Sequence, residues 1–264
     1  MNKFTILSCV ISANLFISGV SVAASLTSEQ QWVLNDLSST NLNTAGFPWS
    51  SEPYAGSLDG HVKRWDISPG HLVPVKLNGS VKAAEAIQTI ENLLGMQLFD
   101  TQSIALTPDD QINRGVIVSL GTAFVMYTPD DMRNQANVSA GPYLANYPSG
   151  FYQANGEIST KLYVNLGTSM ISESDINSDV VAHEFFHALG FGSHFPGFGE
   201  YLGENDPYFS VSDTMSFHAV DVMKTLYSNP IGTAANDLTI YASAAPVPVG
   251  SAGRWPLSPA AFVR

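Results

Sequence analysis

Cysteine is almost absent from this sequence. Among 264 residues there is one, Cys9, and it falls in the N-terminal stretch that we expect to be removed. The mature chain would therefore contain no thiol, which excludes a disulfide framework, a cysteine nucleophile and thiolate ligands to a metal. A metal site in this protein has to be built from His, Asp and Glu side chains.

Positive charge is also scarce. Leaving out Lys3, the chain has 10 basic residues, one fewer than the 11 of the full sequence, against 23 acidic ones, so its net charge is −13. Phosphate backbones and anionic membranes attract proteins of the opposite sign. We therefore expect no nucleic acid and no membrane among the partners of the mature protein.

A long apolar run is missing after residue 24. Residues 1–24 contain one basic residue, an apolar stretch from Phe4 to about Val20, and the first four residues of the small-residue run SVAAS, residues 21–25. This order is typical of an export signal cleaved after Ala23 or Ala24, with a membrane anchor as the alternative. We expect an exported protein, extracellular or periplasmic.

The remaining chain shows no internal repeat and divides by composition into three parts. Residues 25–60, rich in Ser, Asn, Gly and Pro, suggest an N-terminal arm or a short pro-segment. Residues 61–230 form the main domain, and residues 231–264 an irregular C-terminal tail. The sequence does not define the oligomeric state, and we favour a monomer.

Apolar periodicity predicts an α/β fold. In order, we expect a strand or hairpin from Arg64, a helix over 80–95, a buried strand or strand pair over 114–128, a strand over 156–167 with one buried and one available face, a helix over 178–190, and a last helix over 216–229. The helix over 80–95 is the clearest, because Ser80 can cap its start and Gly95 can end it.

The stretch HEFFHALGFGSH, residues 183–194, contains three of the six histidines. Residues four apart lie on the same face of a helix, so His183 and His187 can direct their rings at one ion roughly 2 Å away. Glu184 can then take a proton from a water on that ion without binding the metal itself. This is the HExxH arrangement of zinc peptidases. The alternative is a chance HExxH in which the histidines are half-buried and simply hydrogen-bonded.

A third ligand is expected shortly after the helix. Gly190 can adopt the positive φ that ends a helix and turns the chain back, and His194 follows it. Position 193 is serine, which is not a usual zinc ligand. The other candidates for the third ligand are Glu200, Asp206 and His218. His61 and His71 are expected at the surface, and His218 at the surface or as a helix-capping residue.

This pattern resembles the metzincin clan of zinc endopeptidases, in which HExxHxxGxxH precedes a methionine-containing turn. SDTMSF, residues 212–217, places Met215 in such a turn, where it would pack beneath the site without touching the metal. The resemblance is nearest to serralysin-like and matrixin-like catalytic domains. It is specific over residues 156–230 and only architectural over 60–155.

Two departures from the clan's pattern stand out. The third histidine is one residue later than the pattern places it, which a loop containing Gly190 and Gly192 could absorb. Phe217 stands where serralysins and astacins have a tyrosine, although matrixins manage without that tyrosine.

The resemblance implies a secreted zinc metalloendopeptidase with one catalytic zinc ion and protein or peptide substrates. It also implies a zincin-like α/β fold, in which a twisted mixed β-sheet packs on two long helices, the active-site helix carries HExxH, and a small C-terminal subdomain holds the methionine turn and the final helix. The substrate would lie extended along the free edge of strand 156–167. The alternative is a secreted binding or adhesion protein that keeps this fold with a degenerate site. The two departures favour the alternative, whereas Glu184 argues against it because zinc binding alone does not need that carboxylate.

The N-terminal pattern generates the first prediction. The exported protein should begin near Ala24 or Ser25, because a run of small residues suits cleavage there. N-terminal sequencing of secreted material checks this. Retention of Met1 would contradict it, and a start near residue 60 would identify 25–60 as a removed pro-segment.

Overall fold

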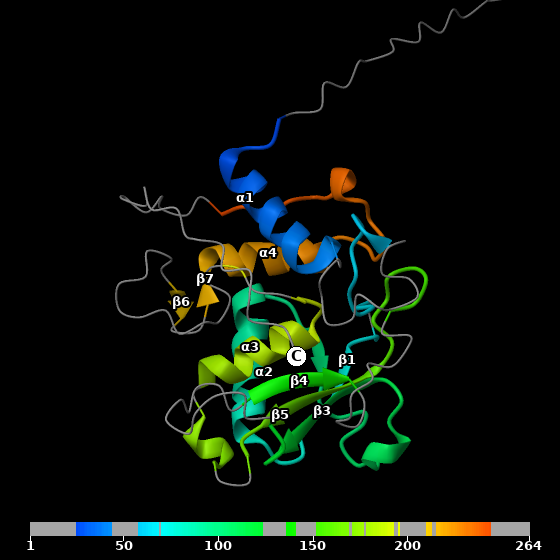
Figure 1. The fold of residues 1–264 in the computed structure, drawn as a ribbon, viewed down its shortest axis with the longest axis vertical. Helices are drawn as coiled ribbons and strands as arrows, with labels where there is room; N and C mark the ends of the chain where they lie inside the picture. Colours follow the sequence, from blue (N-terminus) through cyan, green and yellow to red (C-terminus); the bar gives the residue numbers. More distant parts are fainter. Residues whose placement is uncertain are drawn as a thin grey trace, which may run out of the picture.

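The computed structural model describes residues 25–43, 58–68, 70–123, 136–140, 152–168, 171–176, 178–192, 195, 210–212 and 215–243. The predicted α/β class is confirmed, because helices stack against a mixed five-stranded sheet. Figure 1 shows helix α3 directly above the sheet, with α4 and then α1 in successive layers farther from it. Within the described residues no helix combines the length and apolar character that a membrane span requires.

The sheet has the strand order β2-β1-β3-β5-β4. Its strands are β1 (Val73–Lys76), β2 (Phe99–Asp100), β3 (Gly115–Leu120), β4 (Ala136–Ala140) and β5 (Lys161–Leu166). Strands β2, β1, β3 and β5 run parallel to their neighbours, and β4 pairs antiparallel with β5. Parallel neighbours need crossover connections, and helix α2 (Val81–Leu94) provides the one between β1 and β2.

Strand β5 corrects one expectation. The strand predicted over 156–167 forms a regular ladder over Lys161–Leu166, where β3 pairs along one side and β4 along the other. The prediction that this strand offers a free edge is therefore wrong. Alternating burial reveals which face of a strand is covered, but not which strands lie beside it. Among the described strands, β4 is the edge on this side of the sheet.

Helix α2 confirms its sequence signals. The Ser80 side chain accepts from the N–H of Ala83, and Gly95 ends the helix in the left-handed conformation. The apolar stripe between the two caps is buried. Outside the helix, the Glu173 carboxylate accepts from both the Ser80 hydroxyl and the Lys82 N–H, so it reinforces the cap from a distant segment.

The last two helices predicted for residues 61–230 also lie where the sequence places them. Helix α3 spans Ser178–Ala188 and helix α4 spans Phe217–Ser228. Helix α3 contacts α2, β4 and β5. The described part of the tail, 231–243, is irregular apart from one short 3₁₀ turn and is anchored on α4. There Thr225 accepts from the N–H of Tyr241, and Asp221 accepts from Ser243.

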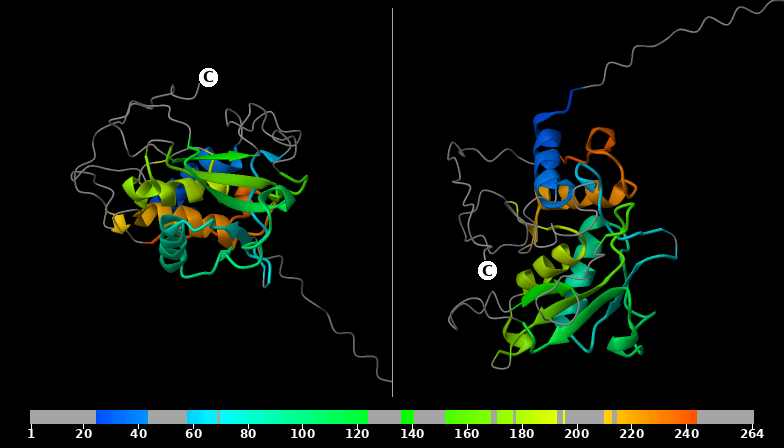
Figure 2. Two further views of the ribbon diagram at one scale, coloured as in Figure 1. Left: turned by 90° about the horizontal axis from the view of Figure 1, so that it is seen from below. Right: turned by 45° about the vertical axis from the view of Figure 1, so that its right-hand side comes forward.

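The N-terminal helix α1 (Ser28–Leu37) continues into a π-helical turn, η1 (Ser38–Leu42), and packs on α4. It begins with a capping box formed by Thr27 and Gln30. Its apolar side chains Val33, Leu37 and Leu42 are buried in the same core as the sheet. The right-hand view of Figure 2 shows α1 against α4.

His218, at the start of α4, is the second correction. It is only 6% exposed, its Nε2 lies 2.5 Å from the Asp36 carboxylate, and its ring stacks on Trp32 at 3.7 Å. The prediction of a surface or capping residue is wrong because α1, 182 residues earlier in sequence, covers it. His71 is exposed as expected, and His61 is half-buried.

Lys63 is buried completely beneath the same N-terminal segment. Its Nζ donates to three backbone carbonyls, those of Leu42, Leu58 and His61, at 2.8, 3.0 and 3.3 Å. Burial lowers the pKa of Lys63 to about 8, so the ammonium is charged at neutral pH and the three acceptors offset its loss of water.

The three carbonyls around Lys63 Nζ, which we call the Lys63 cage, generate the second prediction. Lys63→Met should lower the free energy of unfolding at pH 7 by about 2–3 kcal/mol, because acceptors in the core lose a charged donor. Urea denaturation followed by tryptophan fluorescence measures this. Lys224→Met, at a partly exposed position on α4, is the matched control and should change stability little. Equal stability of the Lys63 variant and the wild type would show that the cage contributes nothing.

Candidate functional site

Helix α3 brings His183 and His187 together on consecutive turns. Their Nε2 atoms lie 3.0 Å apart, and their ring centroids are 4.7 Å apart with the planes at 80°. His183 is buried and His187 is half-buried. The sequence expectation that the two imidazoles point at one place is confirmed for this pair.

The protonation of His187 follows from its other nitrogen. Nδ1 lies 2.6 Å from the carbonyl oxygen of Phe191. A carbonyl oxygen can only accept, so Nδ1 must carry the proton and donate it. In the neutral ring this leaves the lone pair on Nε2, the atom that faces His183. A hydrogen bond of this kind is the usual way in which a protein prepares a histidine to bind a metal.

The distance between the two Nε2 atoms permits two arrangements. Without an ion, a nitrogen pair at 3.0 Å needs one donor, which must be His183 because the lone pair is on His187. Two nitrogens bound to one tetrahedral zinc, each about 2.0–2.1 Å from it, would lie about 3.3 Å apart. A shift of a few tenths of an ångström, together with loss of the proton from His183 Nε2 (to Nδ1 of the same ring or to solvent), therefore converts the hydrogen-bonded pair into a zinc-binding pair. Neutral imidazoles are also ligands that zinc favours, so the two residues fit that ion.

Glu184 follows His183 in the same helix and is 8% exposed. One residue corresponds to about 100° around an α-helix, so its carboxylate leaves the helix beside the histidine face rather than on it. Such a position suits a general base acting next to a metal, because the carboxylate does not compete with the imidazoles as a ligand.

The end of α3 is held by side chains from other segments. Trp65 Nε1 donates to the carbonyl of Ala188 at 2.7 Å, and the Tyr227 hydroxyl donates to that of Leu189 at 2.7 Å. Burial raises the pKa of Tyr227, so its hydroxyl stays a neutral donor. Gly190 then turns the chain with φ +112°, as its position after HEFFH predicts. These donors satisfy carbonyls that a helix C-terminus leaves without partners.

Gly190 also fits because there is no room for a side chain. A Cβ atom at this position would lie 3.0 Å from the carbonyl oxygen of Lys63 and 3.2 Å from Ile158. The glycine therefore serves both the turn and the close approach of a neighbouring segment.

The predicted third ligand, like two of its three alternatives, is not among the residues that the structure describes. His194, Glu200 and Asp206 all lie outside the described residues. His218 is described, and within the described part of the chain no third His, Cys, Asp or Glu joins His183 and His187 in a metal-binding group. His218 is therefore removed from the candidates, whereas His194 remains the sequence prediction.

The predicted methionine turn is described in its backbone only. Strand β6 (Ser210–Ser212) pairs antiparallel with β7 (Met215–Ser216), and Ser212 is the partner of Met215. The chain thus reverses within the few residues between them, as a tight turn requires. Helix α4 follows directly and contacts β7.

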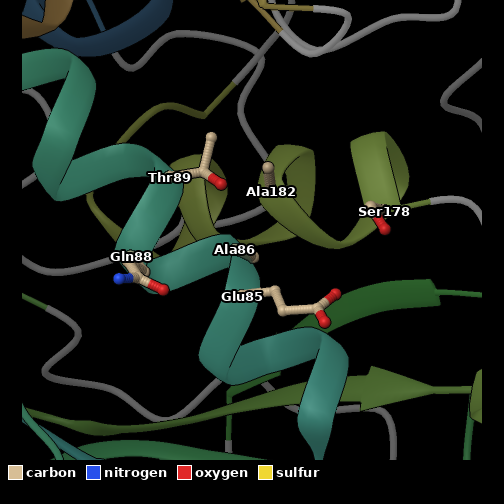
Figure 3. Close-up of a pocket in the computed structure, with 6 residues that line it drawn as sticks. All are labelled: Glu85, Ala86, Gln88, Thr89, Ser178 and Ala182. Atoms are coloured by element: carbon tan, nitrogen blue, oxygen red, sulfur yellow. The ribbon is translucent and has the colours of Figure 1, made fainter.

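A separate cavity of about 330 Å³ lies between α2 and α3. Figure 3 shows its lining: Glu85, Ala86, Gln88, Thr89, Ser178 and Ala182. Neither histidine of the pair lines it, nor does Glu184. It belongs to the helix packing behind the histidine face and is not part of the candidate site.

The sequence reasoning missed the partners of the pair. The acceptor for His187 is a backbone carbonyl, which any residue at position 191 would provide, so no sequence signal could identify it. Trp65 and Tyr227 are isolated aromatic residues whose roles depend on the tertiary fold.

Comparison of the chain with protein-family models, with curated proteins and with solved structures found no match.

Proposed function

We propose that this protein is an exported zinc metalloendopeptidase with a zincin-like fold. His183, His187 and His194 would hold one zinc ion, and Glu184 would be the general base. The observation that carries the proposal is the pair of Nε2 atoms 3.0 Å apart, with the Nδ1 proton of His187 directed to Phe191. An accidental HExxH requires neither feature.

His194 is proposed as the third ligand on its reach. It follows the turn at Gly190 by four residues, so the extra residue falls after the helix that carries His183 and His187. Glu200 and Asp206 are the alternatives. Met215, on the strand that leads into α4, would lie beneath the ligands as an apolar support.

Zinc, when bound, supplies a Lewis acid that lowers the pKa of water to about 7 and polarises a substrate carbonyl. Glu184 would take a proton from the attacking water as the water oxygen forms a bond to the carbonyl carbon. The same carboxyl group then gives that proton to the amine nitrogen as the C–N bond breaks. The products are a carboxylic acid and an amine, and Glu184 returns to its ionised form.

The substrate would pair with β4 rather than with β5. Strand β4 is the edge of the described sheet and packs on α3, the helix that carries the histidines. An extended peptide can add to such an edge by backbone hydrogen bonds, which supports cleavage of varied sequences.

A secreted binding protein with a degenerate site is the second candidate. Phe217 favours it, because this residue is 42% exposed at the start of α4 and has no hydroxyl to contribute to catalysis. The two candidates differ in whether the protein cleaves a substrate and whether that cleavage depends on Glu184.

The third prediction separates these candidates. Glu184→Gln should leave zinc stoichiometry nearly unchanged and reduce cleavage of a denatured protein by at least about 100-fold, because only the general base is lost. Glu85→Gln, on α2, is the matched control and should cleave like the wild type. Full proteolysis by the Glu184 variant would refute the mechanism. Absence of proteolysis in the wild type would favour the binding protein.

The fourth prediction concerns the ligands. His183→Ala and His187→Ala should each lose zinc and activity, and His194→Ala should weaken zinc by more than the about 10–100-fold that loss of an outer partner costs. Competition with a chromophoric chelator measures the affinity, and exposed His71→Ala is the control. If His194→Ala bound zinc normally while a substitution of Glu200 or Asp206 abolished binding, the third ligand would be that carboxylate.

A further inference from the structure

The N-terminal segment Ser28–Leu42 reaches the loop that follows HEFFH. Asn41 is completely buried, and its Nδ2 donates to the carbonyls of Gly190 and Lys63 at 2.7 and 2.6 Å. Its Oδ1 accepts from the N–H of Lys63 at 3.1 Å. The three bonds fix the orientation of the amide, because a flipped amide would oppose like groups at each position.

A second contact lies two residues farther along the loop. The N–H of Gly192 donates to the carbonyl oxygen of Thr40 at 2.7 Å. Asn41 and Thr40 thus hold the residues on both sides of Phe191. The Phe191 carbonyl is the acceptor for His187 Nδ1, so its direction is fixed from the N-terminal segment.

A third contact reaches Phe195. The Phe195 ring meets His218 edge to face at 5.7 Å and Phe191 at 6.3 Å. His218 is in turn held by stacking on Trp32 and by the Asp36 carboxylate. The turn η1 therefore contacts the loop directly after α3, and helix α1 is linked to Phe195 through His218.

We propose that the segment Ser28–Leu42 belongs to the site and that Asn41 is a positioning residue for His187. The part of this proposal that concerns zinc affinity rests on the proposed function. The segment keeps the Phe191 carbonyl in place, and that carbonyl keeps the proton on Nδ1. Without Asn41 the Gly190–Gly192 stretch can turn, Nδ1 loses its acceptor, and the proton redistributes to Nε2, the atom needed for the metal. The segment is accordingly retained in the active protein and is not a removable pro-segment.

The fifth prediction tests this with four variants of the full chain. Asn41→Ala should lower zinc affinity about tenfold, the lower end of the effect of losing an outer partner. Asn41→Ser keeps one donor and should lose less. Asn35→Ala, exposed on α1, should bind as the wild type does. Val75→Ala, in the middle of the sheet, should reduce stability while leaving the affinity unchanged.

Affinity is measured by chelator competition at a temperature where every variant is folded, and stability by urea denaturation. The comparison with Val75→Ala is decisive, because a purely structural role predicts that affinity follows stability in both. Wild-type affinity in Asn41→Ala, or an equal loss in Val75→Ala, would overturn the proposal. If Asn41→Ala does not fold, Asn41→Ser replaces it and must still lose affinity.

A second measurement needs no metal. Long-range ¹⁵N–¹H spectra of the metal-free protein should show the proton of His187 on Nδ1 in the wild type and in Val75→Ala, and a raised Nε2–H fraction in the Asn41 variants. Unchanged spectra in those variants would refute the positioning role. Failure of the wild type to bind zinc would instead refute the proposed function, and the spectra would still judge the positioning.

Discussion

The hydrogen bond from His187 Nδ1 to the carbonyl of Phe191 determines the chemistry of the site. It decides which nitrogen of the ring carries the proton, and so which nitrogen is free to accept a partner. That nitrogen faces His183 at 3.0 Å. Two imidazoles brought together by helical spacing alone could each adopt either tautomer. The Phe191 carbonyl removes this ambiguity for one ring, and the short distance then assigns the donor role to the other.

The segment that leads from α3 to the Phe191 carbonyl is held in place by groups that are distant in sequence. Asn41, Trp65 and Tyr227 each donate to a backbone carbonyl at or just after the end of α3, and each comes from a different segment of the chain. These bonds satisfy polar groups that would otherwise be buried without partners, which costs about 1–3 kcal/mol for each group. The same bonds that stabilise the helix end therefore also orient the residues after it, so removal of any one of these three donors should affect both stability and the geometry of the pair.

The sequence predicted features that depend on local structure. The caps of α2 at Ser80 and Gly95, the burial of its stripe, the extent of α4 and the positive φ of Gly190 follow from nearby residues and were correct. The free edge of 156–167 was wrong, because β4 has the short sequence ANVSA, whose alternation is too weak to predict a strand. His218 was misplaced because its burial depends on α1, and no pattern around position 218 refers to residues 32 and 36. The Phe191 carbonyl could not be predicted, since a backbone acceptor has no residue preference.

The same contacts bear on the proposal that His194, one residue beyond the metzincin pattern, is the third ligand. In a loop held only by the helix, an extra residue would alter every later position. Here Gly190 and Gly192, on either side of Phe191, are held from outside, by Asn41 and by Thr40. Phe195 is fixed again through His218. Because the hydrogen bonds at Gly190, Phe191 and Gly192 all precede position 194, they hold His187 in the same way whichever later residue is the third ligand, so the one-residue departure is compatible with the proposed zinc site.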